Sequence, residues 1–218
     1  MTETKLKARG ILFDLDGTIL DTREAYLQAA KQAFVITGQA PPDDATMLTI
    51  PKRLEQKQSV TGIIRHDTQR FLDAFLGIFY RSVQTKTKPF PNVAATLEEL
   101  SRKAKLAVIT MRFMPKEEIA SELEQFDLAK YFSHIVTAMD TRKPKPSPEA
   151  LIKAVKSMDL QMCECVIVGD SVSDIHAGKA AGAATVAVLS GLYTHEELAL
   201  ACPDLILRDV TELPKFIE

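Results

Sequence analysis

Aspartates gather at two places in this sequence where short apolar runs end. Asp14 and Asp16 come at the end of the run that begins at Ile11, and Asp170 and Asp174 follow the run Cys165–Val168. Runs of this kind are typical of buried parallel strands, and ligands bind at the carboxyl ends of such strands. Carboxylates that meet there repel one another unless cations neutralise them. We therefore expect a hard divalent cation, Mg²⁺ in the usual case, with a lysine offsetting the remaining charge.

Two further polar features follow other apolar runs. Thr110 ends the run Leu106–Thr110, and its small hydroxyl suits hydrogen bonding to an anion. The segment Arg142–Pro146, which contains Lys143 and Lys145, follows the run His134–Ala138. These features predict an anion-binding position beside the carboxylates.

The positions of these residues require a scaffold of alternating strands and helices. Apolar runs predict strands at Ile11–Leu15, Leu106–Thr110, His134–Ala138, Cys165–Val168, Ala184–Leu189 and Leu205–Leu207. Helical spacing and capping signals predict helices at Asn92–Lys103, Pro115–Phe126, Pro148–Met158 and Val172–Ala181. The alternation predicts an α/β fold with a Rossmann-like, doubly wound parallel sheet.

The interval from Thr22 to Lys88 breaks this alternation and contains no strand-like run. It holds two amphipathic stretches, Arg23–Thr37 and Thr68–Gln84, and a turn at Pro41–Asp44. Asp21 is expected to cap the first helix rather than to bind metal. We predict an inserted α-helical domain over residues 21–87 and a core domain made of residues 1–20 and 88–218.

Composition excludes several classes of function. The chain of 218 residues is 46% hydrophobic, which is enough to form a hydrophobic core. Its net charge of −2 shows no excess of the basic residues that nucleic-acid binding requires. It contains no apolar stretch long enough to cross a bilayer, so no membrane partner is expected. Three cysteines, an odd number, argue against a disulfide framework and for a cytoplasmic protein. Neither the cysteines nor the four histidines show metal-ligand spacing. The sequence does not indicate an oligomeric state.

The motif series resembles the haloacid dehalogenase (HAD) superfamily, in particular its phosphoglycolate-phosphatase-like and β-phosphoglucomutase-like subgroup with a C1 helical cap. The motif DxDGT stands as Asp14-Leu15-Asp16-Gly17-Thr18, and the Ser/Thr of the second motif is Thr110. The lysine of KPxP is taken as Lys143, and GDSxxD spans Gly169 to Asp174. The insertion falls where that cap lies in the family, with its specificity loop expected near Thr49–Gly62.

The resemblance implies a two-step phosphoryl transfer. Asp14 would be the nucleophile and Asp16 the general acid and base. Mg²⁺ would be bound by the Asp14 carboxylate, the Asp16 backbone carbonyl and Asp170. Asp174 would be a further ligand or would support the ligands from outside the coordination shell. Thr110 and Lys143 would bind the phosphoryl oxygens, and Lys143 would also restrain the nucleophile.

Residues around the motifs are candidates for substrate binding. Met111 and Arg112 follow Thr110 and would line the pocket, where Arg112 is a candidate to engage an anionic substrate or to pair with the cap. Arg53 and Lys52 in the cap loop are candidates to meet a second anionic group of the substrate, and the alternative is that they form a solvated helix face.

The implied activity is hydrolysis of a small phosphate monoester, a phosphoglycolate-like compound or a sugar phosphate, which makes the protein a phosphoric monoester hydrolase. Thr18 favours a phosphatase over a β-phosphoglucomutase-like phosphosugar mutase, which is the alternative enzyme. A catalytically silent binding protein of the same fold is a third hypothesis. It is disfavoured because such proteins usually lose the nucleophile or a metal-binding aspartate, and Asp14, Asp16, Lys143 and Asp170 are all present.

Overall fold

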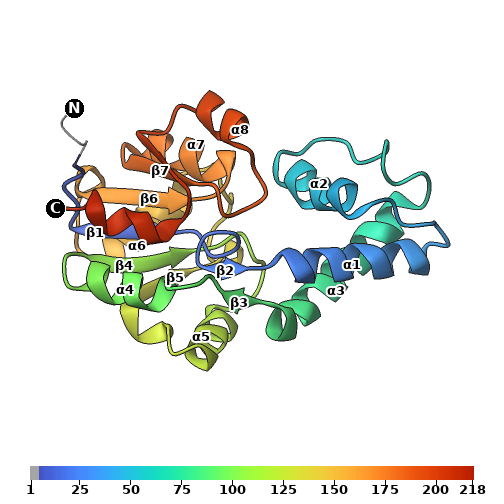
Figure 1. Cartoon of the computed structure of the whole chain (residues 1–218), viewed down its shortest axis with the longest axis horizontal. Helices are drawn as coiled ribbons and strands as arrows, with labels where there is room; N and C mark the ends of the chain where they lie inside the picture. Colours follow the sequence, from blue (N-terminus) through green and yellow to red (C-terminus); the bar gives the residue numbers. More distant parts are fainter. Residues whose placement is uncertain (1–4) are drawn as a thin grey trace. The chain divides into compact units, whose positions relative to one another are not determined.

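The computed structural model describes residues 5–218 and divides the chain into two compact units (Figure 1). One unit holds the chain up to Leu20 together with Pro89–Glu218, and the other holds Asp21–Lys88. The chain passes between them through β2 (Leu20–Asp21) and β3 (Lys88–Pro89), which pair as a two-stranded sheet. The return to the first unit comes one residue later than the sequence predicted.

The first unit is built on a parallel sheet of six strands in the order β5-β4-β1-β6-β7-β8. The strands are β1 (Gly10–Phe13), β4 (Lys105–Ile109), β5 (Phe132–Val136), β6 (Cys165–Gly169), β7 (Ala184–Val188) and β8 (Leu205–Leu207). Each overlaps a predicted strand, and β5 begins two residues before the predicted start at His134. The central strands β1 and β6 are buried along their whole length, as expected for a sheet covered on both faces.

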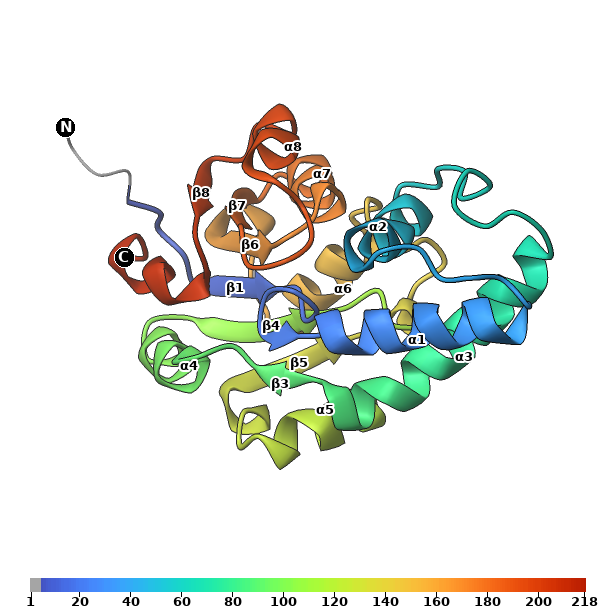
Figure 2. The ribbon, with the colours of Figure 1, turned by 45° about the vertical axis from the view of Figure 1, so that its right-hand side comes forward.

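Helices cover both faces of this sheet (Figure 2). The helices of the first unit are α4 (Val93–Ser101), α5 (Lys116–Gln125), α6 (Glu149–Ser157), α7 (Val172–Ala181) and α8 (His195–Leu200). Short 3₁₀ turns, η1 to η4, span Ala129–Tyr131, Ala138–Asp140, Met162–Glu164 and Val210–Lys215. Right-handed crossovers in opposite directions along the sheet place α4 and α5 on one face and α6 and α7 on the other.

Alternating strand residues form the core beneath each layer of helices. Leu12, Ile109 and Ile167 pack with Leu151 and Val155 of α6 in one buried cluster. The alternate strand positions, such as Phe13 and Val108, are equally buried and face the opposite side of the sheet. Burial on both faces explains why these strands are nearly all apolar in sequence.

The strand order places a crevice at the carboxyl end of β1. The chain moves outward from β1 through β4 to β5 and then returns to β6 on the other side of β1. The connection from β1 reaches β4 through α4 on one face of the sheet, whereas β6 is followed by α7 on the opposite face. Such a switch point is where open α/β sheets bind ligands.

The second unit consists of α1 (Arg23–Ile36), α2 (Asp44–Glu55) and α3 (Thr68–Lys86). Its core is aromatic: Phe34 packs on Phe71, and Phe75 and Phe79 follow along the same face of α3. The Asp21 carboxylate accepts the backbone N–H of Arg23 at 3.1 Å, at the start of α1.

Helix α2 departs from the sequence prediction, which placed a specificity loop at Thr49–Gly62. The helix continues through Pro51 to Glu55, so only the second half of that segment is a loop. Proline inside a helix costs about 3 kcal/mol because it removes a backbone hydrogen bond. Here the helix buries Met47 and Ile50 and is capped by Asp43, which accepts the N–H of Thr46 at 2.9 Å.

Within residues 5–218, none of the helices combines the length and the apolar character that crossing a membrane requires.

Candidate functional site

Three aspartates meet at the crevice. Asp14 directly follows β1, Asp170 directly follows β6, and Asp174 lies in the first turn of α7. All three are buried, and each offers one carboxylate oxygen that lies within 4.8 Å of the other two. The Asp14 N–H donates to the carbonyl of Val168 at 2.8 Å, which extends the β1–β6 pairing into the site.

Two glycines make room for the Asp170 carboxylate. Gly17 has a φ of +80°, which glycine adopts without strain, and a Cβ there would lie 2.5 Å from Oδ2 of Asp170. At Gly191, in the loop after β7, a Cβ would lie 1.7 Å from the same oxygen. The hydroxyl of Ser190 donates to the Gly17 carbonyl at 2.7 Å and holds the two loops together.

A buried lysine lies between two of the aspartates. Lys145 Nζ donates to Oδ1 of Asp14 at 2.6 Å, to Oδ1 of Asp174 at 2.5 Å and to the Ile109 carbonyl at 3.2 Å. Burial alone would lower the pKa of Lys145, but the carboxylates of Asp14 and Asp174 raise it above its ordinary value. The ammonium is therefore held in its charged form at the base of the crevice.

The sequence prediction of Lys143 at this position is wrong. Lys143 is exposed, while its backbone N–H and that of Arg142 donate to the Glu149 carboxylate at 3.2 and 2.9 Å. These bonds fix the loop just before α6 so that the lysine two residues later enters the site. The sequence carries KPxP twice, in overlap: once from Lys143 and once from Lys145.

The electrostatics of the cluster favour a divalent cation. Burial, together with the nearby carboxylates of Asp174 and Asp16, raises the pKa of Asp14 to about 7, although Lys145 acts in the opposite direction. Ionised Asp14, Asp170 and Asp174 carry three negative charges against the one positive charge of Lys145. The two negative charges that remain match one divalent cation, and carboxylate oxygens are the ligands that Mg²⁺ prefers.

Asp174 has two roles in the structure. It forms a capping box with Ser171, whose N–H and hydroxyl donate to its Oδ2 at 3.2 and 2.8 Å. Its other oxygen, Oδ1, accepts from Lys145. Capping therefore fixes the carboxylate in the orientation that the lysine and a metal ion require.

Thr110 lies at the carboxyl end of β4, next to the strand that carries Asp14. The residue is buried, and its hydroxyl accepts the backbone N–H of Arg112 at 3.2 Å. The neighbouring Met111 is half-buried.

The side chain of Arg112 is paired with two acidic side chains, Asp16 and Glu122. It is 1% exposed, and it donates from Nε to Oδ2 of Asp16 at 2.9 Å and from Nη2 to Oδ1 at 2.6 Å. Its Nη1 donates to the carboxylate of Glu122 on α5. Both partners belong to the first unit and form a buried ion-pair network with Arg112. The predicted roles of Arg112 in substrate contact or cap pairing stay predictions.

Arg53 and Lys52 lie on α2 of the second unit and are half-buried. Arg53 Nη1 donates to the Ser59 carbonyl at 2.9 Å, which stabilises the turn after the helix. Their role in substrate binding stays a prediction.

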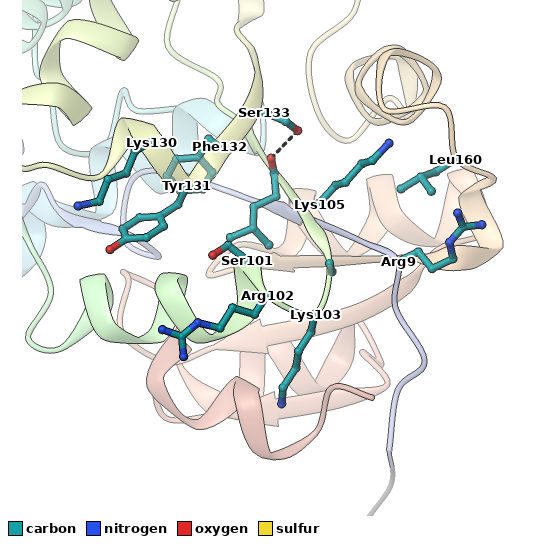
Figure 3. A pocket seen from close by; sticks show the side chains of 12 residues that line it. Arg9, Ser101, Arg102, Lys103, Lys105, Lys130, Tyr131, Phe132, Ser133 and Leu160 are labelled. Atoms are coloured by element: carbon teal, nitrogen blue, oxygen red, sulfur yellow. Dashed lines mark hydrogen bonds between the residues drawn. The ribbon is translucent and has the colours of Figure 1, made fainter.

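A hollow of about 630 Å³ opens at the opposite end of the sheet, at the amino ends of β1, β4 and β5. Five basic residues line it: Arg9, Arg102, Lys103, Lys105 and Lys130. Figure 3 shows their side chains extending in different directions rather than converging. Arg9, Arg102, Lys103 and Lys130 pair with Glu164, Glu98, Glu99 and Asp127, and Lys105 donates to the Met158 carbonyl. The hollow therefore does not present the focused positive charge of an anion site.

Residues 11–188 match the family model described as haloacid dehalogenase-like hydrolase. The chain belongs to the haloacid dehalogenase-like hydrolases. Its curated relatives include the phosphoglycolate phosphatases of Photorhabdus laumondii and Escherichia coli K12, at 30% and 31% identity. Each of these two alignments covers 94% of this chain and 90% of the relative. A haloacid dehalogenase-like hydrolase of Streptococcus pneumoniae shares the fold, with a TM-score of 0.80, 19% identity and coverage of 96% of this chain and 98% of that chain.

As a haloacid dehalogenase-like hydrolase with these phosphatase relatives, the protein is a phosphoric monoester hydrolase. The structure brings Asp14, Asp170 and Asp174 together, with Thr110 on the adjacent strand. Asp16 lies in the same loop as Asp14, after β1, and its carboxylate pairs with Arg112.

Sequence reasoning missed Lys145 and Glu122. The second KPxP makes Lys145 the alternative to Lys143, but the motif by itself does not choose between them. Glu122 lies in the middle of a helix and carried no signal in the sequence.

Proposed function

We propose that this protein is a Mg²⁺-dependent phosphatase that hydrolyses a small phosphate monoester through an aspartyl-phosphate on Asp14. The observation that carries the proposal is the buried contact of Lys145 with both Asp14 and Asp174, with Asp170 alongside. This arrangement combines a restrained nucleophile with a site whose charge calls for a divalent cation.

The residues present fit Mg²⁺. Asp14, Asp170 and Asp174 would hold it, together with the backbone carbonyl of Asp16 that the family resemblance suggests. When bound, the ion neutralises charge on the phosphoryl oxygens and so lowers the barrier to attack by an anionic nucleophile.

In the first step, a carboxylate oxygen of Asp14 attacks phosphorus while the bond from phosphorus to the leaving oxygen breaks. Asp16, in its protonated form, gives its proton to that leaving oxygen, and an alcohol departs. Lys145 keeps the nucleophile in place through Oδ1, and the Thr110 hydroxyl lies at the end of the adjacent strand to bind a phosphoryl oxygen. Such positioning supplies much of the catalysis in phosphoryl transfer.

In the second step, water attacks the phosphorus of the aspartyl-phosphate. The Asp16 carboxylate takes the proton of the water as the bond to Asp14 breaks, so both aspartates return to their starting states. One carboxyl group serves as acid and then as base, which is why its orientation matters in both steps.

Mutation of the nucleophile tests the proposal directly. Wild-type protein with Mg²⁺ should release phosphate from p-nitrophenyl phosphate, and Asp14→Asn should release none while keeping its circular-dichroism spectrum. Trapping of a phosphorylated protein by rapid acid quench should succeed for the wild type and fail for the variant. Normal turnover by Asp14→Asn, or a wild type that is inactive with every divalent cation, would contradict the proposal.

The proposed partner is a small phosphorylated metabolite, and the relatives named phosphoglycolate phosphatase favour a phosphorylated carboxylic acid over other esters. A panel that contains phosphoglycolate and several sugar phosphates, read by phosphate release, tests this choice. The same panel read by sugar-phosphate interconversion tests the alternative mutase, which would convert substrate without releasing phosphate.

The compartment is a further part of the proposal. All three cysteines are free, with Cys163 and Cys202 exposed and Cys165 buried, as suits a reducing cytoplasm. Fractionation of cells that produce the tagged protein would test it.

A further inference from the structure

A buried ion-pair network connects three segments of the first unit around Asp16. Asp16 lies in the loop after β1, Arg112 lies in the loop after β4, and Glu122 lies on α5. The side chains of Arg112 and Glu122 are 1% and 5% exposed, and that of Asp16 is 14% exposed. The network therefore lies under the site, and its open end is the Asp16 carboxylate.

We propose that Arg112, held in turn by Glu122, is a positioning residue that fixes the Asp16 carboxylate for proton transfer. This inference rests on the proposed function, because it assigns a task to Arg112 through the acid and base of that reaction. The contact is bidentate: Nε and Nη2 each donate to a different oxygen of Asp16, at 2.9 and 2.6 Å.

A bidentate contact fixes more than a distance. The planar guanidinium sets the plane of the carboxylate as well as its position, which a lysine ammonium cannot do. Each carboxylate oxygen keeps a second lone pair for the transferred proton, so the contact does not block chemistry. Without it, the Asp16 side chain is free to change rotamer at the edge of the site.

Glu122 explains why Arg112 stays in place. Its carboxylate accepts from Nη1 and, at 3.5 Å, from Nη2, on the side of the guanidinium that Asp16 does not occupy. The Nε, Nη1 and Nη2 donors are thus divided between two acids. A buried charge of this kind is retained only when it is paired and hydrogen-bonded, and here both conditions are met.

The test compares leaving groups. An alkyl phosphate needs a proton on its departing oxygen, whereas 2,4-dinitrophenyl phosphate departs as a stable anion. We expect Arg112→Met to slow leaving-group release in the first turnover about 100-fold for the alkyl phosphate, as misplacement of a catalytic group does. The loss for the dinitrophenyl ester should be several-fold at most. Equal losses for both esters, or faster release from the alkyl phosphate, would overturn the proposal.

A double-mutant cycle tests whether Arg112 acts through Asp16. In the Asp16→Asn background, Arg112→Met should cause no further loss with the alkyl phosphate, because the group that it positions no longer transfers a proton. Losses that multiply in the double variant would assign Arg112 a separate role and contradict the inference.

Two milder variants keep the test decisive if Arg112→Met does not fold. Arg112→Lys keeps the charge but loses the bidentate contact, and it should show the same leaving-group pattern. Glu122→Gln keeps a hydrogen-bond acceptor for Arg112 and should give a smaller loss with the same pattern. Arg102→Met, which removes an exposed arginine paired with Glu98, is the control and should match the wild type.

The outcomes separate this inference from the proposed function. If the proposed function fails, the wild type releases no leaving group in a metal-dependent way or Asp14→Asn stays active. If only the inference fails, the wild type and Asp14→Asn behave as expected but the Arg112 variants show no leaving-group pattern. Thermal melting of every variant identifies losses that come from unfolding.

Discussion

At the scale of single residues, two lysines two positions apart have opposite surroundings. Lys145 is buried between Asp14 and Asp174, whereas Lys143 extends into solvent. The difference comes from the loop and not from the residue type, because Glu149 binds the backbone N–H of Lys143 and sets the direction of the chain.

Variants of Lys145 and Lys143 can be compared directly, with the exposed lysine as the control for the buried one. Lys145→Met should lower kcat by about 100-fold, the cost of misplacing an attacking group, because Asp14 loses the donor that holds its carboxylate. Lys143→Met should leave kcat and KM unchanged. Phosphate release by the two purified variants, measured beside their melting temperatures, checks this, and the reverse ranking would restore the KPxP assignment made from sequence.

The sequence could name residue types for the site but not all of their contacts. Asp14, Asp170 and Asp174 were predictable because strand ends fix their positions. Lys145 was not, since choosing between two overlapping KPxP motifs requires the conformation of the loop. Arg112 was recognised as unusual, but its partner Glu122 lies on a different element, and side-chain pairing across elements leaves no local pattern.

At the scale of elements, the site depends on how closely its loops approach one another. The loop after β7 passes so near Asp170 that only glycine fits at position 191, and the Leu192 N–H donates to Oδ2 of Asp170 at 3.3 Å. This loop therefore packs against the Asp170 carboxylate and fixes its rotamer.

Filling that space should damage metal binding more than folding. Gly191→Ala would place a Cβ 1.7 Å from Oδ2 of Asp170, so we expect the carboxylate to move and the half-saturating Mg²⁺ concentration to rise at least tenfold. Titration of activity with Mg²⁺ measures this.

Gly77→Ala is the matched control, because a Cβ there meets only the end of the Arg81 side chain at 3.7 Å. It lies inside helix α3, where alanine should stabilise the helix by about 0.5–1 kcal/mol. An unchanged Mg²⁺ requirement in Gly191→Ala would show that the loop after β7 does not position Asp170 for metal binding.

Elements were predictable to different degrees for physical reasons. The four inner strands, β4, β1, β6 and β7, could be recognised because burial on both faces leaves almost no polar residues in them. The edge strand β5 is only partly buried and contains Ser133 and His134, and it begins two residues before the predicted start. Helix α2 could not be recognised, because it contains Pro51 and half of its residues are polar, which resembles a loop. Its stability comes from the burial of Met47 and Ile50 in the second unit, and tertiary packing of that kind overrides local propensity.

At the scale of the whole molecule, folding brings the carboxylates of Asp14, Asp170 and Asp174 close together, and their mutual repulsion destabilises the folded state. Burial raises the pKa of Asp14 from 3.8 to about 7, so the folded protein holds this proton more tightly than the unfolded chain does. The stability that this group contributes is present below pH 3.8 and is lost as the pH rises through about 7. Near neutral pH, the metal-free protein therefore stores repulsion that a bound cation can relieve.

This linkage predicts how Mg²⁺ and pH act together on thermal stability. Mg²⁺ requires ionised carboxylates, so protons compete with it below pH 7, and the increase in Tm that it causes should be larger at pH 8 than at pH 6. A concentration of 100 times Kd adds about 2.7 kcal/mol, which corresponds to roughly 5–10 °C for a chain of this size. Differential scanning calorimetry with and without Mg²⁺ at both pH values measures the effect. Asp170→Asn should abolish most of the increase at both pH values. Asp14→Asn, which removes another proposed ligand, should leave a smaller increase that no longer depends on pH. An increase that is equal at the two pH values, or larger at pH 6, would mean that Asp14 does not titrate against the metal.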